Sequence, residues 1–184
     1  MKKLIMIAAF IVAALSANAQ NEVGQITLQP KAGISIAKIT GDGTKYAVGL
    51  AAGVEAEYGV AENFGLTLGA LYSMQGYKAD GADKKCCMDY INIPILAQYY
   101  VAKGFAIKAG VQPGFLVRAS YDGNSFSDAC EKFDFSIPVG LSYEIDNFVL
   151  DARYNFGLTK TLKGASEKTK NSVFQITVGY KFAL

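Results

Sequence analysis

The chain contains no histidine and no tryptophan among its 184 residues. The absence of histidine excludes a Ser-His-Asp triad, a Cys-His pair and any metal site with an imidazole ligand. Carboxylates such as Glu55, Glu57 and Asp151 could still perform acid–base chemistry. Glu55 and Glu57, however, stand at i and i+2 on one strand face, where basic side chains of neighbouring strands are expected to meet them. We therefore predict no catalytic residues, no metal and no cofactor.

Long hydrophobic runs are missing too, except near the N-terminus. Residues 4–15 are apolar, follow Lys2-Lys3 and precede the small-x-small sequence Ala17-Asn18-Ala19. This order is typical of a secretory signal peptide, with an uncleaved anchor as the alternative. After it, no run approaches the roughly 18 apolar residues that a membrane-spanning helix needs. We expect a cleaved signal peptide over residues 1–19 and one exported domain over residues 20–184.

Neither sign of charge dominates the expected domain. The whole chain has 18 Lys+Arg and 16 Asp+Glu, and the two basic residues of the signal peptide leave 16 of each. A neutral chain without a basic run predicts no nucleic-acid partner. Hydrophobic residues make up 51% of the whole chain. In an exported protein, their side chains must either fill a soluble core or face lipid.

Alternation of apolar and polar residues is the dominant pattern from about residue 26 onward. From residue 173, the even positions Phe174, Ile176, Val178 and Tyr180 are apolar, whereas the odd positions are polar or small. Such alternation predicts strands with one apolar face. The expected strands are 26–39, 47–60, 64–78, 89–101, 105–119, 133–145, 148–158 and 173–184. Their lengths of roughly 10 to 14 residues suit a tilted membrane-spanning strand better than an ordinary strand of about 5 to 6.

Short and long connections alternate between these strands. The short ones are Ala61-Glu62-Asn63, Ala102-Lys103-Gly104 and Asp146-Asn147. The long ones are polar and lie near 40–46, 79–88, 120–132 and 159–171. Membrane barrels have this asymmetry, with short periplasmic turns and longer external loops.

Aromatic residues of the apolar parity gather at both ends of the expected strands. Near the short turns are Tyr58, Phe64, Tyr99, Phe105, Tyr143, Phe148 and Phe182. Near the long loops are Tyr72, Phe115, Phe133, Phe135, Phe156 and Phe174. Two belts of this kind match the interfacial girdles of a membrane barrel. The sequence thus predicts an all-β fold, an eight-stranded antiparallel up-and-down transmembrane β-barrel.

Four strand motifs carry a resemblance to a known family. They are Tyr90-Ile91-Asn92-Ile93-Pro94-Ile95-Leu96, Asp151-Ala152-Arg153-Tyr154-Asn155-Phe156-Gly157-Leu158, Val178-Gly179-Tyr180-Lys181-Phe182 and Leu71-Tyr72-Ser73-Met74-Gln75-Gly76. In order and spacing they resemble strands of the Bacteroidetes outer-membrane β-barrel family, to which PorT-like proteins belong. The resemblance implies the outer membrane of a Gram-negative cell as location. The partners to be expected are outer-membrane lipid and the barrel-insertion machinery.

The polar parity of the strands collects charged residues that would face the lumen. An eight-stranded barrel is just wide enough for its own side chains to fill it, and isolated charges there are costly. We therefore expect a plug of ion pairs and hydrogen bonds, with a narrow conduit or small ligand cavity as the alternative. The charged members are Glu55, Glu57, Lys108, Arg118, Asp134, Glu144, Asp151, Arg153 and Lys181.

Three cysteines and three strand prolines complete the sequence-based expectations. Cys86 and Cys87 lie in one long loop and Cys130 lies in the next. In an exported chain, a disulfide could therefore join Cys130 to Cys86 or to Cys87. A structural bridge is favoured over a thiolate metal site, which would have too few ligands. The prolines Pro94, Pro113 and Pro138 predict bulges or lost ladder bonds, because proline has no N–H to donate.

The expected function is that of an integral outer-membrane barrel with a structural or surface-interaction role. The alternative is a soluble periplasmic, lipocalin-like barrel whose apolar faces enclose a small hydrophobic ligand. The two differ in which face of the strands points inward.

Overall fold

A computed structural model describes residues 23–39, 44–79, 85–121, 124–125, 130–160 and 170–184. The expected signal peptide, residues 1–19, and parts of the four long connections lie outside these ranges. In the described residues, no helix is long and apolar enough to cross a membrane.

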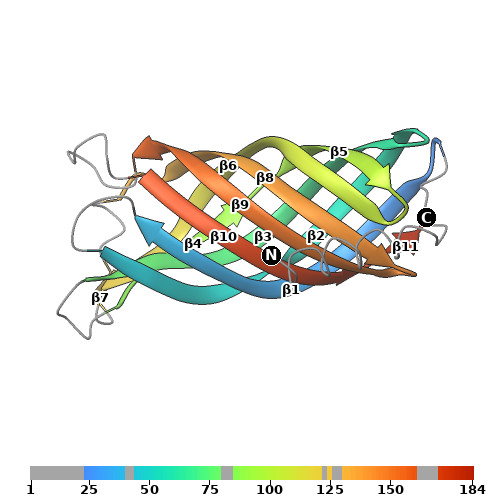
Figure 1. Ribbon diagram of the computed structural model, residues 1–184. Coiled ribbons are helices and arrows are strands. Elements are labelled where there is room, and N and C mark those ends of the chain that lie inside the picture. Colours follow the sequence, from blue (N-terminus) through green and yellow to red (C-terminus); the bar gives the residue numbers. More distant parts are fainter. Residues whose placement is uncertain (1–22, 40–43, 80–84, 122–123, 126–129, 161–169) are drawn as a thin grey trace, which may run out of the picture.

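The described chain forms antiparallel strands that wrap into one closed sheet (Figure 1). The strands are β1 (Ile26–Ile39), β2 (Thr44–Ala61), β3 (Phe64–Ala79), β4 (Lys85–Asn92), β5 (Ile95–Ala102), β6 (Phe105–Tyr121), β7 (Asn124–Ser125), β8 (Phe133–Ile145), β9 (Phe148–Lys160), β10 (Lys170–Tyr180) and β11 (Phe182–Ala183). β4 and β5 continue each other along one path, as do β10 and β11, and β7 is a short extension paired only with β6. The described residues thus form eight barrel strands, which confirms the predicted architecture.

Closure occurs between the first and last strands. β1 pairs with β10 from Lys31↔Gly179 to Ile39↔Asn171, and β11 continues the pairing with β1. Every other neighbour in the barrel is next in sequence order. The short turns meet at the end of the barrel that holds β11, and the strand ends that lead into the long connections lie at the opposite end, which is on the left in Figure 1. We call these the turn end and the loop end.

Two expected strands agree with the structure at both boundaries, and others run further. β1 and β8 have the predicted limits, whereas β2, β3 and β6 have 18, 16 and 17 residues. Their added residues lie mainly at the loop end. The turns are tight: Gly104 has φ 71° and Asp146 has φ 52°, a left-handed conformation that glycine and aspartate tolerate better than most residues.

Burial alternates along each strand, with the polar parity inside. In β10 the pattern from Val173 onward is buried at odd positions and exposed at even ones. Gln175 and Thr177 are therefore interior, while Val178 is 54% exposed on the outside. The predicted girdle residues are all exposed or half-buried on this outer face. An apolar exterior around a polar interior is the arrangement of a barrel surrounded by lipid.

The prolines disturb the sheet less than the sequence suggested. Pro113 pairs with Phe135 and Pro138 with Asn155 in ladders that keep their register. Pro94 separates β4 from β5, yet the parity is the same on both sides, and the Pro94 carbonyl accepts a hydrogen bond from Gly69 N at 3.0 Å. Each proline removes only its own N–H, and the pairs on either side hold the register.

A bulge occurs instead where no proline stands. Asp89 pairs with Arg118, but Tyr90 pairs with Leu116, so Val117 of β6 has no opposite residue. A bulge of one residue moves every later side chain of that strand to the other face. This shift decides the position of Arg118.

Candidate functional site in the barrel lumen

A cluster of five charged residues fills the middle of the lumen. It comprises Lys31 of β1, Glu55 of β2, Lys108 of β6, and Asp151 and Arg153 of β9. Each side chain points inward because it has the polar parity of its strand. All five are at most 5% exposed, so every charge in this cluster depends on its neighbours rather than on water. We call this the central cluster.

The two carboxylates of the central cluster connect its three cations. The Glu55 carboxylate contacts Lys31 Nζ and Arg153 Nη2, each at 2.9 Å. Asp151 contacts Lys108 Nζ at 3.0 Å and Lys31 Nζ at 3.4 Å. It also lies 3.3 Å from Arg153 Nη2. These contacts tie β1 and β2 to β6 and β9 across the lumen, so the middle of the barrel is crossed by ion pairs.

A second cluster lies nearer the turn end. Lys181 Nζ contacts Glu57 Oε2 at 2.9 Å and Glu144 Oε1 at 2.5 Å. The Tyr100 hydroxyl lies 2.8 Å from a carboxylate oxygen of each glutamate and accepts a hydrogen bond from Gln98 Nε2. One hydroxyl has a single proton, so it can donate to only one glutamate at a time. Lys181 is the cation that both carboxylates share, and we call this group the turn-end cluster.

Glycines of β3 make room for the two buried glutamates. A Cβ added at Gly65 would lie 2.7 Å from Glu57 Oε1, and one added at Gly69 would lie 2.6 Å from Glu55 Cγ. Real Cβ atoms do not approach other heavy atoms so closely. These inward positions of β3 therefore admit only glycine while the neighbouring carboxylates keep their place.

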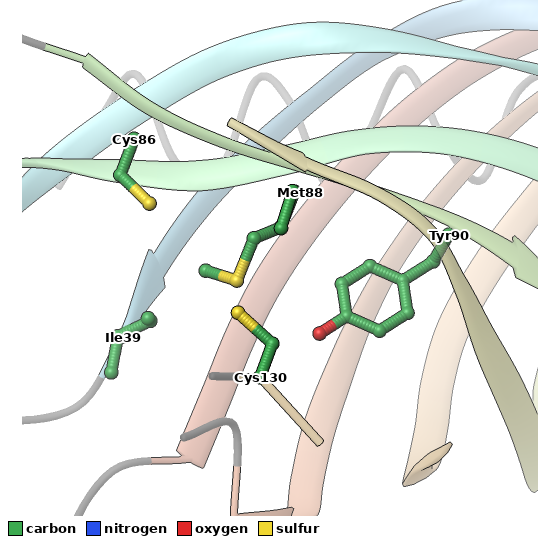
Figure 2. Packing of buried hydrophobic residues seen from close by; sticks show 6 residues of the cluster. Ile39, Cys86, Met88, Tyr90 and Cys130 are labelled. Carbon is green, nitrogen blue, oxygen red and sulfur yellow. The ribbon is translucent and has the colours of Figure 1, made fainter. Parts of the chain in front are cut away.

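The loop end of the lumen is closed by a cluster of a different kind. The buried residues there are Ile39, Cys86, Met88, Tyr90, Ala119 and Cys130, with Leu116 packed against them. Figure 2 shows the side chains of Ile39, Cys86, Met88, Tyr90 and Cys130 converging from different parts of the chain onto one interior space. We call this the loop-end cluster. The lumen thus has two charged layers and an apolar, sulfur-rich layer above them.

The structure places eight of the nine predicted lumen charges in the interior, but not in one network. Glu55, Lys108, Asp151 and Arg153 belong to the central cluster, and Glu57, Glu144 and Lys181 to the turn-end cluster. Asp134 is buried apart from both and accepts a hydrogen bond from Thr159 Oγ1 at 2.9 Å.

Arg118 departs from the expectation that it faces the lumen. Its side chain is exposed, because the bulge at Val117 moves it to the outer face of β6. There it stands opposite Asp89, whose carboxylate accepts a hydrogen bond from the Tyr72 hydroxyl at 2.8 Å. Alternation alone could not locate a one-residue insertion in the ladder.

Lys31 and Tyr100 are lumen residues that the sequence reasoning missed. Lys31 shares the parity of Ser35 and is opposite in parity to Ile34 and Ile36, so extending the alternation from Ile34 back toward Pro30 would have found it. Tyr100 is adjacent to the outward Tyr99, and its inward parity was visible in the same way. Both residues complete clusters whose other members were predicted.

The expected disulfide stays a prediction, and the structure shows which cysteines lie in one space. The structure has all three as thiols. Cys86 and Cys130 are buried in the loop-end cluster, whereas Cys87 has the outward parity of β4 and is half-buried. Of the two alternatives left by the sequence, only Cys86 therefore shares a space with Cys130. Within the described residues, no three His, Cys, Asp or Glu side chains are placed to hold a metal ion together.

Comparison with known proteins identifies what this geometry resembles. Residues 18–163 match the family model described as outer membrane protein beta-barrel domain. No curated protein matches the chain.

Three solved structures have the same fold at low identity. The crystal structure of Ail, the attachment invasion locus protein of Yersinia pestis, is 17% identical over 88% of this chain and all of that one, with TM-score 0.55. Neisserial surface protein A is 16% identical over 89% of this chain and 98% of its own, with TM-score 0.52. OprG of Pseudomonas aeruginosa is 14% identical over 88% and 98%, with TM-score 0.51.

Proposed function

Since the chain belongs to the family of outer membrane protein beta-barrel domains, we propose that it acts as a closed, non-conducting barrel that anchors its long loops at the cell surface. The protein is an integral barrel of the Gram-negative outer membrane with a structural or surface-interaction role. In this proposal, no solute or hydrated ion passes through the lumen.

The observation that carries this proposal is the crossing of the lumen by the central cluster. Glu55 and Asp151 bind cations from opposite sides of the barrel at 2.9 to 3.4 Å. A solute or hydrated ion would have to separate these pairs, and separating a buried pair without compensation costs about 3–5 kcal/mol. The turn-end and loop-end clusters add two further layers along the same axis. These three filled layers support the proposal that the barrel acts as an anchor and not as a channel.

The soluble, lipocalin-like alternative requires the opposite orientation of the strands. Its apolar parity would point inward around a ligand cavity. In this barrel the apolar parity is outside, as Leu68 and Leu141, 56% and 47% exposed, illustrate. The polar parity fills the interior, so the structure is that of the membrane barrel.

Three finer parts of the proposal rest on the sequence. The order of the sequence motifs, with Tyr90 and Pro94 in one motif and Asp151 and Arg153 in another, supports membership of the PorT-like branch. Export as a barrel implies a passing contact with the barrel-insertion machinery. The family and the missing histidine support an absence of catalysis, so that Glu55 and Asp151 are structural carboxylates. Assaying hydrolysis of lipid substrates by the purified barrel checks this last part, for which we expect no activity.

Conductance across a planar lipid bilayer tests the proposal directly. We expect the purified wild-type chain to insert without stable current steps. Changing Glu55, Asp151 and Arg153 to alanine removes the ion pairs of the central cluster, and adding alanine at Glu57, Glu144 and Met88 opens the other two layers. Only the combined variant should conduct, because each layer by itself fills the lumen. The control is Arg118→Ala, which removes a charge from the outer face and should stay silent. Reproducible current steps from the folded wild-type chain would refute the proposal.

A further inference from the structure

The loop-end cluster gathers sulfur atoms from separate parts of the chain. Cys86 and Met88 are on β4, and Cys130 lies two residues before Lys132, whose carbonyl accepts a hydrogen bond from Leu116 N of β6. All three sulfur-bearing residues are at most 1% exposed. Figure 2 shows their sulfur atoms turned into the same interior space, with the Tyr90 hydroxyl directed to the same side. Three sulfurs therefore converge within one enclosed layer of the lumen.

The strand order disfavours a disulfide between the two cysteines. β6 pairs with β4 on one side and with β8 on the other, and Cys130 comes three residues before β8 begins. Neighbouring strands are about 4.8 Å apart, so the backbones of β4 and β8 stand about two such spacings apart. A disulfide needs Cα atoms within about 7 Å of each other and sulfurs about 2.05 Å apart. Two cysteines held at the spacing of β4 and β8 would exceed this limit.

A metal ion spans a larger gap between the same sulfur atoms. Thiolate–metal bonds are about 2.3 Å long, as in zinc sites, so two sulfurs on one ion lie about 4 Å apart. Buried side chains that enter from β4 and from the segment just before β8 suit this longer reach. Met88, on the same face as Cys86, adds a thioether as third ligand.

We propose that Cys86, Met88 and Cys130 form a binding site for a soft, thiophilic cation of the Cu(I) class. Thiolate and thioether ligands select Cu(I) over harder ions, which prefer oxygen. An apolar surround favours such a low-charge ion, and the Tyr90 hydroxyl supplies a donor for charge remaining on a thiolate. The site is separate from the ion pairs that close the lumen, so it goes beyond the anchoring role of the barrel.

Binding at this site exchanges protons for the ion without any change of oxidation state. Each cysteine that coordinates loses its S–H proton to solvent as its sulfur forms a bond to Cu(I). The thioether of Met88 has no proton and contributes a lone pair only. Affinity should therefore increase as pH rises, and no oxidant or reductant takes part.

Titration of the full, folded chain with Cu(I) alone tests this site. The purified barrel in detergent, reduced and kept under an inert atmosphere, is titrated against a competing Cu(I) chelator. Bound copper per chain and thiolate-to-copper ultraviolet absorption are recorded together. We expect one tightly held copper per wild-type chain. Cys86→Ser and Cys130→Ser should each lose it, and Met88→Leu, which keeps the apolar packing, should bind more weakly.

The neighbouring cysteine provides the matched control. Cys87→Ser changes a thiol one position away on the outer parity, and it should retain the tightly held copper. Retention of the folded form in unboiled gel samples shows for each variant that loss of copper is not loss of the barrel. The proposal is overturned if the wild-type chain holds no copper against the chelator, if Cys87→Ser alone abolishes binding, or if Cys86 and Cys130 are found joined in the isolated protein.

Discussion

The residues of the central cluster do not contribute equally to its charge balance. Asp151 contacts all three cations, whereas Arg153 is one of three cations that share two carboxylates. Removing Arg153 leaves two lysines with two carboxylates, a balanced set. Removing the charge of Asp151 leaves three cations with one carboxylate. The acid is therefore the more critical partner, although both residues are 2% exposed.

Asp151→Asn is expected to destabilise the folded barrel by about 3–5 kcal/mol, the cost of leaving buried charges without their partner. Arg153→Met should cost less, because the remaining charges balance. Equilibrium unfolding by urea in phospholipid vesicles measures both changes. The matched control is Asp146→Asn in an exposed turn, where asparagine also tolerates the positive φ and the change should stay within about 0.5 kcal/mol. Equal losses for the two aspartates would contradict this account of the cluster.

A second residue-level prediction concerns Lys181, the shared cation of the turn-end cluster. Lys181→Met leaves Glu57 and Glu144 facing each other across the Tyr100 hydroxyl and should destabilise the barrel by about 3–5 kcal/mol. Adding Glu144→Gln removes one of the opposed charges and should recover part of this loss. The double-mutant cycle, measured by the same unfolding experiment, gives the coupling between the residues. If the two losses simply add, Lys181 does not hold these carboxylates together.

At the scale of the strand, the two faces of one element meet different solvents. In β8, Ser136 and Ser142 are buried in the lumen, while Val139 and Ile145 are exposed on the outer face. Val139 stands at the centre of the strand and Ile145 at its turn end. If the outer face is in lipid, depth in the bilayer should govern the cost of a charge there.

Val139→Arg is expected to cost about 2–4 kcal/mol, since it places a charge near the midplane of the bilayer. Ile145→Arg makes the same substitution at the membrane interface and should cost about 0–1 kcal/mol. Unfolding of both variants in phospholipid vesicles measures the difference, with wild-type protein as reference. A barrel surrounded by water would lose little in either case, and equal small losses would argue against the lipid-facing wall.

At the scale of the whole molecule, closure of the sheet ties the first strand to the last. β1 pairs with β10 and β11 as well as with β2, so no barrel strand in the described chain is left with an open edge. Buried ion pairs then join strands that are far apart in sequence, such as Glu57 with Lys181. A closed, cross-braced barrel should resist denaturation as a unit.

The gel mobility of the barrel should therefore depend on heating. Unboiled protein in detergent is expected to migrate faster than boiled protein, because the closed barrel stays compact and binds less detergent. Cell fractionation should recover the same species in the outer membrane. Asp151→Asn offers an internal check, since its unboiled form should convert at a lower temperature than wild type. Recovery in the soluble periplasm without a heat shift would contradict the membrane barrel.

The sequence alone determined the strands and which of their faces is apolar. Alternation is set by covalent geometry, since successive side chains of an extended chain point to opposite sides. It gave the limits of β1 and β8, the turns, the apolar exterior and most of the lumen charges, and it would have given Lys31 had the pattern been followed from Ile34 back toward Pro30.

Only the tertiary structure decided which residues meet. Pairing register depends on closure of the whole sheet, so the bulge at Val117 that turns Arg118 outward leaves no mark in the local pattern. The same holds for the division of the charges into two clusters. It also holds for Met88, which no cysteine spacing suggests as a neighbour of Cys130. Contacts across a barrel join residues distant in sequence, and alternation along one strand contains no information about the strand opposite.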